Sequence, residues 1–258
     1  MLASPVRLLA ALAAVLLSAP ACGGDDEIVN DGEPPAIDSG VPDAGIDAEN
    51  LCPGAVTFEA FAANLESGSA EFDVAVTEVG NPSNTESSAP NGRVVICLPE
   101  DTDLELSAEK TDYLTRVDAL PSFVVGQFSP STLPYPLFVI TEAAADTLYS
   151  DLGTTFMAPD GQVVVSVVEY PAGTPLEGAT VEIDKADTGQ FTRDESGGFA
   201  DGNAIAGGGL VLFANVPLAG GDVEITVTPP DSFRGNCIGP TALALAAGQM
   251  SGALFTCQ

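Results

Sequence analysis

The sequence has no histidine and no tryptophan, and its 258 residues include only 7 Lys and Arg against 37 Asp and Glu. The absence of histidine excludes Ser-His-Asp and Cys-His catalysis and any metal site built on imidazole. The net charge of -30 repels phosphate backbones and anionic lipid head groups. We therefore expect no nucleic acid among the partners, which should be neutral, basic or cationic.

Residues 1–21 have the layout of a secretory signal, with one cation, Arg7, followed by an apolar run over residues 8–17. The run is too short for a permanent membrane span. Residues 18–22 read Ser-Ala-Pro-Ala-Cys and resemble the lipobox of bacterial lipoproteins. The resemblance implies cleavage before Cys22, a lipid on this cysteine, and a location at the outer membrane or cell surface. An ordinary cleaved signal is the alternative.

The segment after the signal, residues 22–50, contains no Lys or Arg and is rich in Gly, Pro, Asp and Glu. It shows no apolar periodicity, so it cannot bury enough surface to offset the entropy lost on ordering. We predict a disordered acidic tether between Cys22 and the folded part of the chain.

Four cysteines remain after Cys22, and an exported chain normally joins such cysteines in disulfides. Three pairings are possible. We favour the sequential one, Cys52 with Cys97 and Cys237 with Cys257, because it keeps each bridge inside one predicted domain. A zinc site is the weaker alternative, since the sequence offers no C-x-x-C pair and no histidine.

Beyond residue 51 the chain consists of short alternating apolar segments separated by Gly, Pro, Asn and Asp. A period of two predicts β-strands that each bury one face. The order of the segments occurs twice, with residues 56–61, 92–97 and 103–108 corresponding to residues 163–168, 209–214 and 222–227. This repetition predicts two copies of one β domain, over residues 51–157 and 158–258.

Residues 141–152 are the exception to this pattern and predict a short helix between the copies. Thr141 is a suitable N-cap and Gly153 a suitable stop. Apolar side chains share one face of the predicted helix, so we expect it to close the first domain or to bridge the two.

Residues 163–168 form an apolar run, residues 175–181 read Pro-Leu-Glu-Gly-Ala-Thr-Val, and residues 213–217 read Phe-Ala-Asn-Val-Pro. This order of segments resembles the carboxypeptidase regulatory-like domain. The resemblance implies a transthyretin-like β-sandwich of about seven strands that is generally non-catalytic. Residues 231–258 depart from the family and predict a disulfide-closed terminal hairpin. The expected fold class is therefore all-β, with two tandem transthyretin-like or Ig-like sandwiches after the signal peptide and tether.

A Gly-rich loop region in the second predicted domain gathers several carboxylates. Hard cations such as calcium take oxygen ligands from flexible loops of this kind. The spacing does not follow the EF-hand pattern, so solvated turn residues are the alternative. The candidate ligands are Asp184, Asp187, Asp194, Glu195 and Asp201.

These observations favour a non-enzymatic envelope protein without a cofactor, anchored by lipid and acting as a structural or ligand-binding module. Its expected partners are the membrane, through the anchor, and a glycan or another envelope protein. Two alternatives stay open: a secreted hydrolase or peptidase accessory with a carboxylate site, and a calcium-stabilised surface adhesin. Raised pKa values on two neighbouring acids in a concave pocket would support the hydrolase.

Overall fold

The computed structural model describes residues 52–100, 102–121 and 134–258. The predicted signal peptide, Cys22 and the acidic tether lie outside the described residues. Within these ranges strands predominate, and helix α1 covers Glu142–Asp151. No helix in the same ranges has the length and apolar character needed to cross a membrane. The predicted all-β class is confirmed.

The first repeat forms a sandwich of two sheets. Strand β1 lies between β4, antiparallel, and β7, parallel. Strand β5 lies between β2 and β6, antiparallel to both, and β3 pairs with β2. Buried side chains of both sheets, such as Phe58, Leu106 and Leu137, share one core. The strands are β1 (Val56–Asn64), β2 (Ala75–Glu78), β3 (Thr85–Ser87), β4 (Arg93–Leu98), β5 (Leu104–Glu109), β6 (Thr115–Leu120) and β7 (Tyr135–Val139).

The second repeat uses the same pairing pattern for the strands that the repeated order of segments relates to one another. Strand β8 lies between β13, antiparallel, and β17, parallel, while β14 lies between β10 and β16. The strands are β8 (Gly161–Glu169), β9 (Thr174–Pro175), β10 (Thr180–Ile183), β11 (Gly189–Arg193), β12 (Phe199–Asp201), β13 (Leu210–Val216), β14 (Val223–Thr228), β15 (Cys237–Ile238), β16 (Ala242–Leu243) and β17 (Gln249–Cys257).

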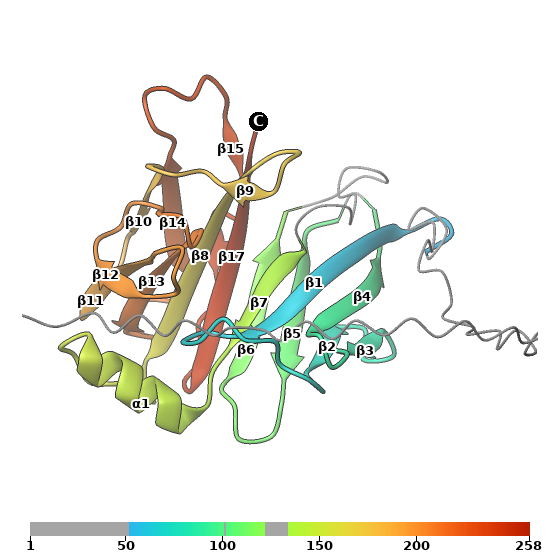
Figure 1. The fold of residues 1–258 in the computed structure, drawn as a ribbon, viewed down its shortest axis with the longest axis horizontal. Coiled ribbons are helices and arrows are strands. Elements are labelled where there is room, and N and C mark those ends of the chain that lie inside the picture. The colour runs from blue at the N-terminus through green and yellow to red at the C-terminus, as the bar shows by residue number, and fades with distance from the viewer. Residues whose placement is uncertain (1–51, 101, 122–133) are drawn as a thin grey trace, which may run out of the picture. The chain divides into compact units, whose positions relative to one another are not determined.

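Strand β17 joins the two repeats. One of its edges pairs in parallel with β8, and the other pairs in parallel with β6 of the first repeat. A single sheet therefore runs through both repeats in the order β12-β11-β13-β8-β17-β6-β5-β2-β3 (Figure 1). The division of the chain at residue 157 stays a prediction, and strands from both sides of it share this sheet.

The central strands of the second repeat are buried on both faces, so the prediction of one buried face per strand is wrong for them. Val163 and Val165 of β8 enter the core of the second sandwich, whereas Val164 enters a separate core beneath α1. A strand covered on both sides needs apolar residues at consecutive positions. This explains the uninterrupted valine run in β8.

Helix α1 begins and ends as the sequence predicts. The Thr141 side chain accepts a hydrogen bond from the backbone N–H of Ala144 at 3.1 Å, and Gly153 follows the helix with φ of 76°. Its buried face, which includes Leu148, packs in one core with Phe138 of the first repeat and Leu212 of the second. The helix thus bridges the repeats.

Both predicted disulfides are present. Cys52 is bonded to Cys97, with 5.4 Å between the Cα atoms, and Cys237 is bonded to Cys257. The second bridge ties β15 to the end of β17, where the two strands pair antiparallel. The predicted terminal hairpin is thus closed by a disulfide, but the connection between its two strands contains β16, which pairs with β14.

The segment of residues 175–181 contributes to the fold. Leu176, Ala179 and Val181 are buried in the core of the second sandwich. Gly178 has φ of 82°, a left-handed conformation that favours glycine. The segment therefore turns the chain into β10.

Candidate functional site

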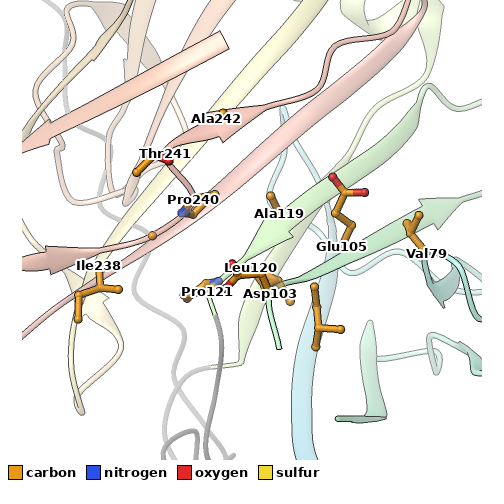
Figure 2. Close-up of a pocket in the computed structure, with 12 residues that line it drawn as sticks. Val79, Asp103, Glu105, Ala119, Leu120, Pro121, Ile238, Pro240, Thr241 and Ala242 are labelled. Carbon is orange, nitrogen blue, oxygen red and sulfur yellow. The ribbon is translucent and has the colours of Figure 1, made fainter. Parts of the chain in front are cut away.

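A cleft of about 640 Å³ lies at the junction of the two repeats. Residues 249–253 of β17 pair with β6, and Thr256 and Cys257 pair with β15, so the cleft forms where these two neighbours of β17 meet. Its volume falls in the range of ligand-binding pockets. This junction cleft is lined by Val79, Asp103, Leu104, Glu105, Ala119, Leu120, Pro121, Ile238, Gly239, Pro240, Thr241 and Ala242 (Figure 2).

The lining of the junction cleft forms two banks. One bank contains Glu105 on β5 and Val79, whose backbone N–H donates to the Glu105 carbonyl at 2.8 Å. The other is the segment 238–242, and Ala119 of β6 lies between the banks in Figure 2. Each bank belongs to a different repeat, so the cleft depends on the pairing of β17 with β6.

Two exposed apolar residues line this cleft, one on each bank. Val79 and Ile238 are 46% and 52% exposed, and both line it. Phe72 and Met157 are the other large apolar side chains that are exposed in the described ranges, and neither lines the cleft. Exposed apolar surface with a polar rim is typical of an interaction site.

The cleft is also acidic. Its described lining includes Asp103 and Glu105 but no Lys or Arg. Two cations elsewhere are engaged by other groups: Lys110 Nζ lies 2.6 Å from a carboxylate oxygen, and Arg193 stacks 4.9 Å from the centre of the Phe138 ring. Low-dielectric walls that carry one sign of charge concentrate ions of the opposite sign. The cleft should therefore attract cations.

Strand β6, which contributes Ala119 and Leu120 to the cleft lining, also contains a buried ion pair. The Arg116 guanidinium donates to both carboxylate oxygens of Asp118, and both side chains are fully buried. Arg116 also donates to the Phe138 carbonyl at 2.8 Å and to the Tyr135 hydroxyl at 3.4 Å. Desolvation alone would lower the pKa of Arg116, but the charges and hydrogen bonds of Asp118 and Tyr135 together outweigh it and raise this pKa. These bonds hold β6 to β7.

Two carboxyl groups have pKa values shifted in the direction opposite to the one that a general acid requires. Desolvation raises the pKa of Glu71, but hydrogen bonds from Lys110 and Tyr113 outweigh it and set the pKa below its ordinary value. The Ser196 hydroxyl likewise holds the pKa of Asp194 below its ordinary value. A hydrolytic acid requires a raised pKa. Neither group supports the hydrolase alternative.

The five carboxylates predicted to bind calcium occupy separate turns and strands. Asp184, Asp187 and Asp194 each accept a backbone N–H, at 2.8, 3.0 and 2.9 Å. Asp201 of β12 is paired with Phe191 of β11, and Glu195 lies against Gly207. The described part of the chain holds no group of three or more Cys, Asp or Glu placed to bind a metal. Calcium binding stays a prediction without such a cluster.

The comparison with known proteins identifies no family. No protein-family model matches the chain, and no curated protein sequence matches it. Among solved structures, it is similar to the Bacillus anthracis TIE protein, with 11% identity and a TM-score of 0.26. That match covers 79% of this chain but 34% of the TIE chain, so this chain spans about a third of its length.

Two pilins are similar at the same level. The shaft pilin SpaA of Lactobacillus rhamnosus GG has 10% identity and a TM-score of 0.23, covering 79% of this chain and 98% of the pilin. A streptococcal ancillary pilin has 10% identity and a TM-score of 0.24, covering 80% and 63%. Scores this low carry no argument, so the fold assignment rests on the strand pairing described above.

Sequence reasoning missed the junction cleft because its residues come from four separate segments. Ile238 offered a weak signal, as an isolated apolar residue in a Gly- and Pro-rich segment beside a cysteine. Asp103 and Glu105 could not be singled out from the sequence, since acidic residues are common throughout the chain.

Proposed function

We propose that this protein is a non-catalytic module of the bacterial envelope that is anchored by a lipid on Cys22 and binds a ligand at the junction cleft. The observation that carries the binding role is the cleft itself, which combines ligand-sized volume with the exposed apolar residues Val79 and Ile238. Two disulfides support an exported location, because such bonds persist in oxidising compartments.

The proposal retains the resemblance of residues 161–230 to the carboxypeptidase regulatory-like domain, a non-catalytic module. The buried Leu176, Ala179 and Val181 and the left-handed Gly178 give its signature a structural role in this chain. Aliphatic residues and prolines are the majority of the residues in the cleft lining, while polar atoms contribute more than half of its exposed surface, so a ligand could make both apolar contacts and hydrogen bonds there.

The anchor is tested by the variant Cys22→Ser in the producing bacterium. We expect loss of label from a clickable palmitate analogue and a shift of the protein from the membrane to the soluble fraction, because no acylated cysteine remains. The matched control is the double variant Cys52→Ser with Cys97→Ser, which should keep both label and membrane association. Membrane association and labelling that survive in Cys22→Ser would overturn the anchor.

Binding at the cleft is tested by methyl NMR of the full chain with a neutral probe, an N-acetylated Leu-Gly-Leu-Gly-Leu amide. We expect the methyl signals of Val79 and Ile238 to shift in a saturable manner. Met157 is an internal control, because it is 41% exposed and lies outside the cleft lining. Equal shifts at Met157, or none at Val79 and Ile238, would contradict this binding site.

A further inference from the structure

We propose that the occupant of the junction cleft is an extended segment of another protein, with Lys or Arg at alternate positions and apolar residues between them. This inference rests on the proposed function, namely that the cleft binds a ligand. It adds the chemical class of the ligand and the conformation in which it binds.

The spacing of the carboxylates indicates an extended peptide. Asp103 directly precedes β5 and Glu105 is the second residue of that strand, so the two are two positions apart, and both line the cleft. Alternate residues of a strand lie on one side, roughly 6.6 Å apart. Alternate side chains of an extended peptide have the same separation, so two basic residues two positions apart can each meet one carboxylate.

The opposite bank supplies the apolar half of the recognition. Ile238, Pro240 and Ala242 line this side (Figure 2). Ile238 is 52% exposed. In an extended peptide the residues between the basic ones point the other way, toward this bank. Burial of their apolar surface there stabilises the complex.

The net charge of the protein indicates which kind of partner can bind at this cleft. A second copy of this chain also carries a net charge of -30, so electrostatic repulsion opposes self-association at an acidic cleft. A basic segment is attracted by the same field. Its Lys or Arg side chains would also supply the positive charge that is absent from the described cleft lining.

The test measures fluorescence anisotropy of a labelled Lys-Leu-Lys-Leu-Lys-Leu peptide with the full chain. We expect the double variant Asp103→Lys with Glu105→Lys to bind about tenfold more weakly, since two attractions become repulsions. The control Glu182→Lys with Asp201→Lys makes the same change in net charge at exposed positions outside the cleft, and should bind within about twofold of wild type. The milder pair Asp103→Asn with Glu105→Gln guards against misfolding and should also weaken binding.

Two further peptides separate the parts of the inference. A Lys-Ser peptide of the same charge should bind about tenfold more weakly, because it buries little apolar surface. A Glu-Leu peptide should not bind measurably. Equal binding by either peptide, or equal loss in both charge-reversal variants, would overturn the inference.

The neutral probe separates failure of this inference from failure of the proposed function. If Leu-Gly-Leu-Gly-Leu shifts Val79 and Ile238 while Lys-Leu shows no preference over Glu-Leu, the ligand class is wrong and the binding site stands. If neither Lys-Leu nor the neutral probe shifts these methyl signals, both proposals fail.

Discussion

At the scale of single residues, Glu71 shows how one carboxylate couples stability to pH. It accepts hydrogen bonds from Lys110 Nζ at 2.6 Å and from the Tyr113 hydroxyl at 3.0 Å. Although burial raises the pKa of Glu71, these partners set it below its ordinary value. A depressed carboxyl pKa stabilises the fold above the unfolded-state pKa, and the contribution is lost as the pH falls through the folded-state pKa.

We therefore expect Glu71→Gln to lower the free energy of unfolding by about 1 kcal/mol at pH 7. The difference from wild type should close at an acidic pH below the depressed folded-state pKa, where the wild-type carboxyl takes up a proton. Urea denaturation at both pH values measures this, with Glu86→Gln as an exposed control that should match wild type at each. If Glu71→Gln remains less stable than wild type in acid, the shape of the Glu71 side chain, not its charge, causes the loss of stability.

At the scale of elements, the contact of β17 with β6 depends on a glycine. Gly252 of β17 is paired with Asp118 of β6. A Cβ at Gly252 would overlap the Asp118 carboxylate and lie 3.0 Å from Arg116 Nη2. Any side chain at this position would displace a fully buried ion pair.

We expect Gly252→Ala to destabilise the protein by about 3 kcal/mol, the range found when buried ion pairs are broken. Gly80→Ala is the control: no atom lies within 4 Å of the added methyl, and φ of 87° leaves only a backbone penalty of about 1 kcal/mol. Urea denaturation compares the two. Equal losses would show that β6 and β17 adjust to the methyl and that their packing is looser than the structure indicates.

The elements also show which features the sequence could predict. Capping at Thr141, the cysteine pairing and the repeated strand order are local or pairwise patterns, and the structure contains them. The position of β17 between β8 and β6 is different, because parallel pairing joins segments far apart in sequence. Residues 249–257 do not alternate in polarity, so nothing local distinguishes this strand from an outer one.

The junction cleft follows from that long-range pairing and was unpredictable for the same reason. Asp103 and Ile238 come together only because β6 and β15 both lie along β17. The prediction for Cys22 differs, because it rests on a local motif and not on long-range pairing, and Cys22 lies outside the described residues. Local patterns thus predicted the elements, while the candidate site arises from their assembly.

At the scale of the whole molecule, the repeats share structure in two places. The long sheet passes from β8 through β17 to β6, and the core beneath α1 contains Phe138 of the first repeat and Leu212 of the second. Separate unfolding of either repeat would break the pairing of β17 with β6 and expose this shared core. Both penalties favour simultaneous unfolding.

We therefore expect scanning calorimetry of the full chain to show one transition, with equal van't Hoff and calorimetric enthalpies. Two independent sandwiches would instead give two transitions, or a van't Hoff enthalpy of about half the calorimetric value. Gly252→Ala extends the test, because a methyl at the β6–β17 contact should weaken the coupling between repeats. Its transition should broaden or split, whereas that of Gly80→Ala should stay single. Two resolved transitions in the wild-type chain would show that β17 does not couple the repeats, and would leave the junction cleft free to open.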